Sequence, residues 1–163
     1  MRPLRLAGIG ILALGLLAAA SSQASADGRC IEARGEIVDQ PTADNCPPDF
    51  TCIAGAVRLN HGIHGTSFFM LDSLAPGPST APGYRSVNGR IVFTLDDGDT
   101  ITASETAISN QNLNAGTGHA GGIEDITGGT GRYAGASGFM YVDQHPEDHH
   151  FIAKIHGQIC RAT

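Results

Sequence analysis

Residues 90–105 read RIVFTLDDGDTITASE, two alternating segments on either side of a turn rich in Asp and Gly. A three-residue loop at 96–98, with Gly98 in the left-handed conformation, brings the apolar residues of both segments onto one face. That face consists of Ile91, Phe93, Leu95, Ile101 and Ala103, and Glu105 follows on the same side. The stretch therefore predicts a β-hairpin whose apolar face ends in a carboxylate.

The same period of two recurs near both ends of the chain. Alternate apolar or small residues fall on one face from Ile31 to Ile37 and again from Phe151 to Ile159. A further strand is predicted from Val57 through Ile63, continuing past Gly65 to Leu71. No stretch after residue 26 has convincing helical periodicity. We therefore expect an all-β domain, an antiparallel barrel of about eight short strands.

The composition supports a single turn-rich domain. Gly accounts for 22 of the 163 residues, nearly twice its usual share of about 7%. The chain is 41% hydrophobic and 16% charged, which is enough apolar material for a core and argues against disorder. Two segments rich in Gly, Pro or Asn, 75–84 and 109–122, are predicted to be surface loops.

The first 26 residues are typical of a secretory signal peptide. Arg2 and Arg5 precede an uncharged run from Leu6 to Ala20, and small residues lead to a cleavage site after Ala26. The alternative is an uncleaved membrane anchor, although the run is shorter than the roughly 20 residues that a spanning helix needs. We expect residues 27–163 to be the domain of a secreted protein, either extracellular or periplasmic.

Charge limits the partners of that domain. Cleavage removes two of the 10 basic residues and none of the 16 acidic ones. An acidic domain of this kind repels nucleic acid and anionic membranes, so neither is expected as a partner.

Export to an oxidising compartment favours disulfides for the four cysteines. Cys46 and Cys52 bracket a segment that turns readily, so we expect a local bridge there, which leaves Cys30 to pair with Cys160. The second bridge requires the two ends of the domain to be neighbours. A zinc site made of the four thiolates is the alternative, but the chain lacks paired C-x2-C knuckles. No metal or cofactor is expected.

The densest pattern is GGTGRYAGASG at residues 128–138, between two strand-like segments. Its glycines indicate left-handed backbone positions and close approach of chains. A phosphate-binding loop is excluded because no G-K-[ST] ending and no helix pattern follow. The motif is expected to have a structural role, carried by Gly128, Gly129, Gly131, Tyr133, Gly135 and Gly138.

This segment resembles the hallmark GGTG-x-[FY]-x-GA-x-G of the allene oxide cyclase and dirigent barrel superfamily, in particular its secreted bacterial members. The resemblance implies an eight-stranded, calycin-like antiparallel barrel with an apolar cavity, in which the motif joins two strands. Plant members cyclise an unsaturated fatty acid epoxide or steer the coupling of phenoxy radicals. Ser137 stands where dirigent proteins usually have an Arg, so the resemblance predicts the fold and not the activity.

Four side chains are candidates for a ligand site within such a barrel. Glu105 lies on the apolar face of its hairpin, where burial would raise its pKa and suit it to general acid or base chemistry. His61 alternates with apolar residues and could face inward, unless the strand breaks at His61-Gly62. Phe93 is expected to contribute to the apolar wall. Tyr141 shares a face with Phe139 and could offer its hydroxyl, although packing is the commoner role.

Residues 143–150 combine His with carboxylates, a set that can bind zinc or copper. Their spacing matches no named catalytic motif, and we expect a solvated hairpin tip. With no complete catalytic set in the sequence, the expected function is binding or guidance of a small hydrophobic molecule. Two alternatives stay open. One is a cyclase or isomerase acting on an unsaturated lipid-like or phenolic substrate through Glu105 and Tyr141, and the other is a structural or surface-interaction protein with a filled barrel.

Overall fold

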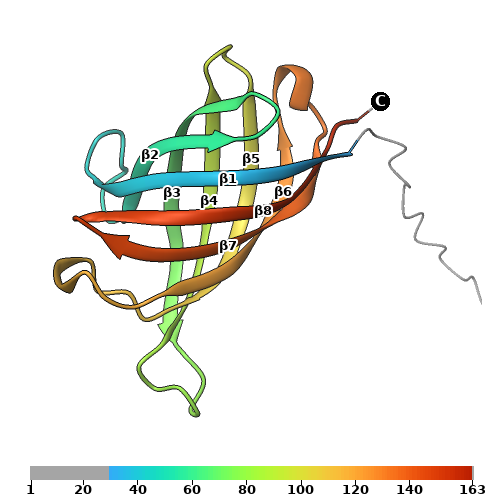
Figure 1. Ribbon diagram of the computed structural model, residues 1–163. Coiled ribbons are helices and arrows are strands. Elements are labelled where there is room, and N and C mark those ends of the chain that lie inside the picture. Colours follow the sequence, from blue (N-terminus) through green and yellow to red (C-terminus); the bar gives the residue numbers. More distant parts are fainter. Residues whose placement is uncertain (1–29, 163) are drawn as a thin grey trace, which may run out of the picture.

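The computed structural model describes residues 30–162 and shows a closed barrel of eight antiparallel strands (Figure 1). Each strand pairs with the next in the sequence, and the last pairs with the first. The strands are β1 (Cys30–Thr42), β2 (Cys52–Leu59), β3 (Ile63–Pro76), β4 (Arg85–Leu95), β5 (Thr100–Ser109), β6 (Ala120–Gly129), β7 (Ser137–Glu147) and β8 (His150–Cys160). The described residues contain no α-helix, only two short 3-10 turns, so the predicted fold class is confirmed.

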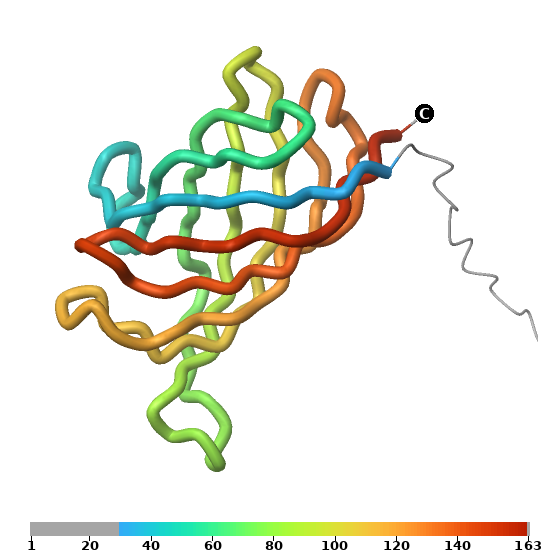
Figure 2. Tube along the Cα trace, in the orientation of Figure 1, coloured from blue at the N-terminus to red at the C-terminus, as the bar shows by residue number. Residues whose placement is uncertain are grey.

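Pairing of β1 with β8 closes the barrel, and the two strands run side by side in Figures 1 and 2. Cys30 is the register partner of Cys160, and a disulfide joins them. A second disulfide joins Cys46 to Cys52 across the β1–β2 connection. Both predicted pairings are confirmed, and the described residues include no free cysteine.

The hairpin of β4 and β5 has the register that its loop length predicts. Phe93 pairs with Ile101 and Gly89 with Glu105. The backbone N–H of Gly98, which has φ of 90°, donates to the carbonyl of Leu95 at 2.9 Å. The three-residue loop thereby places Glu105 on the same face as the apolar residues, inside the barrel.

The expected strand through 57–71 is wrong in one respect, because the chain reverses direction within it. His61 and Gly62 both have positive φ, 56° and 72°, and form a turn between β2 and β3. Leu59 and Ile63, on either side of this turn, are register partners. The break at His61-Gly62, which the sequence left open as the alternative, is therefore the arrangement that the structure shows.

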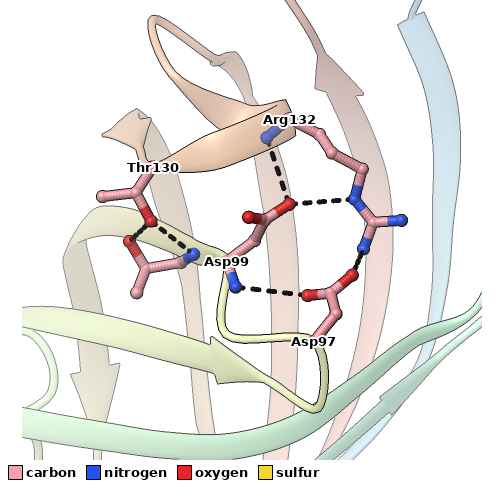
Figure 3. A network of polar contacts seen from close by, with 5 residues as sticks. Asp97, Asp99, Thr130 and Arg132 are labelled. Carbon is pink, nitrogen blue, oxygen red and sulfur yellow. Dashed lines mark hydrogen bonds and ion pairs between the residues drawn. The ribbon is translucent and has the colours of Figure 1, made fainter.

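The glycine motif connects β6 to β7 through a 3-10 turn at Gly131–Tyr133. Figure 3 shows how Arg132 fastens this turn to the β4–β5 hairpin. Its Nε and its backbone N–H both donate to Oδ2 of Asp99, at 3.0 and 3.1 Å, and its guanidinium also pairs with Asp97. On the other side, Thr130 Oγ1 accepts from the backbone N–H of Thr100 at 2.9 Å. The motif is therefore a clamp between two hairpins.

Gly131 shows why this clamp needs glycine. Its φ is 55°, and a Cβ at this position would lie 1.7 Å from a carboxylate oxygen of Asp99. A side chain would displace the carboxylate that holds Arg132.

The lumen is filled at one end and open at the other. The end that holds the glycine motif and the Cys30–Cys160 bridge is packed by large apolar side chains, with Phe93 1% exposed and Tyr133 4% exposed. The other end lies where β1, β3, β5 and β7 finish. The loop at 77–84 extends beyond the barrel there, as the green segment at the bottom of Figure 2 shows. Any internal site must therefore lie toward this second end.

The signal peptide expected at residues 1–26 lies outside the described residues. Within residues 30–162 no helix is both long and apolar enough to cross a membrane.

The two disulfides should contribute unequally to stability. In the chain-entropy model the stabilisation increases with the loop that a bridge closes, and the sequence separations are 130 and 6 residues. Replacing Cys30 and Cys160 by Ser should lower the free energy of unfolding by about 5 kcal/mol, and the same change at Cys46 and Cys52 by about 2 kcal/mol. Urea denaturation of both double variants measures this, and equal losses would contradict it.

Candidate functional site: an acidic cavity in the barrel

A cavity of about 140 Å³ occupies the open half of the lumen. Its lining is mainly apolar and comes from all eight strands. The lining residues are Ile37, Asp39, Thr51, Ile53, Phe69, Leu71, Val87, Ile91, Glu105, Ala107, Ser109, Gln111, Ala120, Glu124, Val142, Gln144 and Ala153. Three carboxyl groups interrupt the apolar wall, and they define the chemistry of the site.

The side chain of Asp39 lies in the space that a glycine leaves free on the neighbouring strand. Across β1, β2 and β3 the register row is Asp39, Gly55 and Ser67. A Cβ on Gly55 would lie 2.5 Å from Oδ1 of Asp39, so only glycine leaves room for the carboxylate. Through this gap Ser67 Oγ donates a hydrogen bond of 2.5 Å to the same oxygen, and both side chains are buried.

Glu105 and Glu124 face each other across neighbouring strands. They are register partners on β5 and β6, so their side chains leave the sheet side by side on the inner face. On the other side of Glu105 lies Gly89 of β4, and the ring of Phe69 occupies the space that a side chain on Gly89 would take. The partner of Glu124 on β7 is Met140, which is fully buried. Glu124 itself is only 2% exposed.

Burial raises the pKa of all three acids. Loss of hydration raises the pKa of Asp39 to about 6, against the smaller lowering effect of its hydrogen bond from Ser67. Burial and then the nearby charge of Asp39 raise the pKa of Glu105 to about 7. Burial first, then repulsion from Glu105 and Asp39, raises the pKa of Glu124 well above its usual value. At neutral pH the cavity therefore holds a mixture of protonated and ionised carboxyls.

Two buried polar atoms in the lining have no hydrogen-bond partner among the described residues, Oε2 of Glu124 and Nε2 of Gln111. Proteins rarely leave such atoms unpaired, because each forfeits its bonds to water. Together they offer an oxygen and an N–H donor to a molecule inside the cavity. No group of three or more His, Cys, Asp or Glu within residues 30–162 is arranged to hold a metal ion.

Of the four residues expected at a ligand site, the structure places only Glu105 in the cavity. His61 is exposed in the β2–β3 turn, which corrects the expectation that it faces inward. Phe93 is buried, but it packs in the filled half and does not line the cavity.

Tyr141 is 51% exposed and stacks edge-on against Phe139 outside the barrel. The residues of β7 that face inward are Met140 and Val142. Phe139 and Tyr141 are therefore on the outer face of this strand, not on the inner face where the sequence predicted Tyr141.

Asp39 and Glu124 were missed, although the sequence holds a signal for each. Asp39 is the next inward position after Ile37 in the alternation of β1. Glu124 is two residues before the buried Ile126 in β6. The inward position of both acids is predicted if the alternation of each strand is continued across the charged residue.

The His-rich tip lies outside the cavity. His119 pairs with Asp143 at 3.3 Å, and His145 with Glu147 at 3.4 Å, all with side chains at least 38% exposed. These are solvated pairs near the open end of the barrel.

Comparisons of the chain with models of protein families, with curated proteins and with solved structures found no match. The function must therefore be argued from the cavity.

Stability should decrease as the pH rises from 4.5 to 7.5. In this range the folded protein keeps protons on Glu105 and its neighbours that the unfolded chain has released, so raising the pH favours unfolding. Replacing Glu105 by Gln should reduce the decrease by roughly 3 kcal/mol. Denaturant titrations at both pH values measure the effect, with the exposed Asp125→Asn as the control. An unchanged pH dependence in Glu105→Gln would contradict the burial of this acid.

Proposed function

We propose that the protein is a secreted barrel that binds or guides a small, mainly apolar molecule in the open half of its lumen. The observation that carries this proposal is the cavity of about 140 Å³, which side chains from eight strands surround without filling. An apolar cavity of about 150 Å³ engineered in another protein accommodates benzene. A ligand with a ring-sized apolar portion therefore fits, and a longer one would extend toward solvent.

Two further observations support this proposal. All four cysteines form disulfides, as is usual for proteins outside a reducing cytosol. The glycine motif resembles that of the allene oxide cyclase and dirigent barrels, and this resemblance implies an apolar cavity. The unfilled cavity favours a container over a structural or surface-interaction protein with a filled barrel.

An isomerase or cyclase is the second candidate, and one observation favours it. The pKa of Glu105 lies at about 7, so this residue can give up or accept a proton at neutral pH, as general acid–base catalysis requires. Tyr141, which would have been its partner, lies outside the barrel. Asp39 and Glu124 would take that place. Turnover of an unsaturated epoxide that Glu105→Gln abolishes without unfolding would decide for the enzyme.

Filling the cavity should abolish binding. Ala107 lines the cavity on β5, and Ile108, the next residue, points outward and is 41% exposed. Benzyl alcohol should bind the wild-type protein, and Ala107→Phe should lower its affinity about tenfold or more because the new ring occupies the lumen. Ile108→Phe, the same enlargement on the outer face, should leave the affinity unchanged.

NMR titration of the three proteins measures these affinities, and native mass spectrometry of protein from its own host shows whether a molecule co-purifies. If benzyl alcohol binds Ala107→Phe as well as it binds the wild type, the cavity is not the binding site.

A further inference from the structure

Every titratable side chain that lines the cavity is an acid. Asp39 comes from β1, Glu105 from β5 and Glu124 from β6, whereas the other five strands contribute only apolar or neutral polar residues to the lining. No Arg, Lys or His among the described residues lines the cavity to balance these three groups. An anionic ligand, such as a free carboxylate, would therefore add a like charge to an acidic chamber.

Glu124 is the lining residue whose side chain most needs a hydrogen-bond donor from a ligand. It is 2% exposed, and its Oε2 has no hydrogen-bond partner among the described residues. Its register partner is a second acid, Glu105, which cannot donate to it once ionised. Ionising Glu124 in the empty cavity would leave a buried carboxylate without a donor, which is costly, and a bound N–H donor would remove that cost.

A cation beside Glu124 would supply the missing donor or charge partner. The structure distinguishes between a metal ion and an organic cation. Within residues 30–162 no set of three ligating side chains is placed to hold a metal ion. The rest of the lining is mainly apolar, with Ile37, Phe69 and Ile91 among its residues. An organic cation combines the two properties, since its charged end can pair with a carboxylate while its body packs against apolar side chains.

We propose that the ligand of the cavity is a compact amine in its protonated form, with the ammonium beside Glu105 and Glu124 and the apolar body in the rest of the lumen. This inference rests on the proposed function and names the class of molecule that the container takes. The ammonium donates to Oε2 of Glu124, so the buried oxygen gains the partner that it lacks. Because a positive charge favours the ionised form of nearby acids, binding releases protons from the three carboxyls to solvent.

Release of protons gives the binding a definite pH dependence. The acids that face the ligand are Asp39, Glu105 and Glu124, and no other strand contributes a titratable group. Between pH 5 and 8 a primary amine stays protonated, as a lysine side chain does. Asp39, with a pKa of about 6, and Glu105, with a pKa of about 7, lose their protons over the same range. The affinity for the amine should therefore increase with pH.

Benzylamine and benzyl alcohol form a matched pair of probes, because they share a ring and differ in the charged end. Titration calorimetry of the protein should show the affinity for benzylamine rising about tenfold or more from pH 5 to 8, with proton release, while that for benzyl alcohol stays constant. Glu124→Gln should remove the preference for the amine and keep the binding of benzyl alcohol. Glu105→Gln provides a second variant with the same expectation.

Asp125→Asn is the matched control, because Asp125 follows Glu124 on β6 and is exposed. It should leave both affinities unchanged. If benzyl alcohol binds the wild type and benzylamine binds no more tightly at pH 8, the amine inference is overturned and the container proposal stands. If neither probe binds, the container proposal itself fails.

Discussion

Pairing of β1 with β8 is the contact on which the rest of the structure depends. Ten residue pairs, from Cys30 with Cys160 to Asp39 with Phe151, close the sheet, and a disulfide fixes the first of them. Because side chains alternate across a strand, this register also decides what faces the lumen. A shift by one residue would turn Asp39 outward and Gln40 inward. Closure thus brings an acid of the first strand into the same chamber as Glu105 and Glu124.

The three acids are a local cost that the fold tolerates. Glu105 and Glu124 lie opposite each other, and Asp39 is close enough to raise the pKa of both. Apolar residues in these positions would remove the repulsion and the desolvation together. Buried groups that break the rules of core packing concentrate at functional sites. The acids and the cavity occur at the same end of the barrel, away from the packed end closed by the glycine clamp.

The fold was largely predictable from sequence, and the site was not. The period of two around Asp96–Gly98 fixed both the hairpin register and the inward side of Glu105, because one loop length was compatible with the apolar pattern. His61 was misplaced because a tight turn interrupts the alternation, and Tyr141 because exposed aromatic residues on β7 resemble an inner face. Asp39 and Glu124 interrupt apolar patterns. Only the register across strands shows that Gly55 makes room for one and Glu105 faces the other.

Three carboxyl groups share one cavity in the barrel, where burial raises the pKa of each. A carbon-13 NMR titration of the side-chain carboxyls between pH 3 and 9 would show this. We expect titration midpoints of about 6 for Asp39 and about 7 for Glu105, with the midpoint of Glu124 well above that of a hydrated glutamate. Midpoints of about 4 for all three, the values of hydrated carboxyls, would mean that none of these groups is buried.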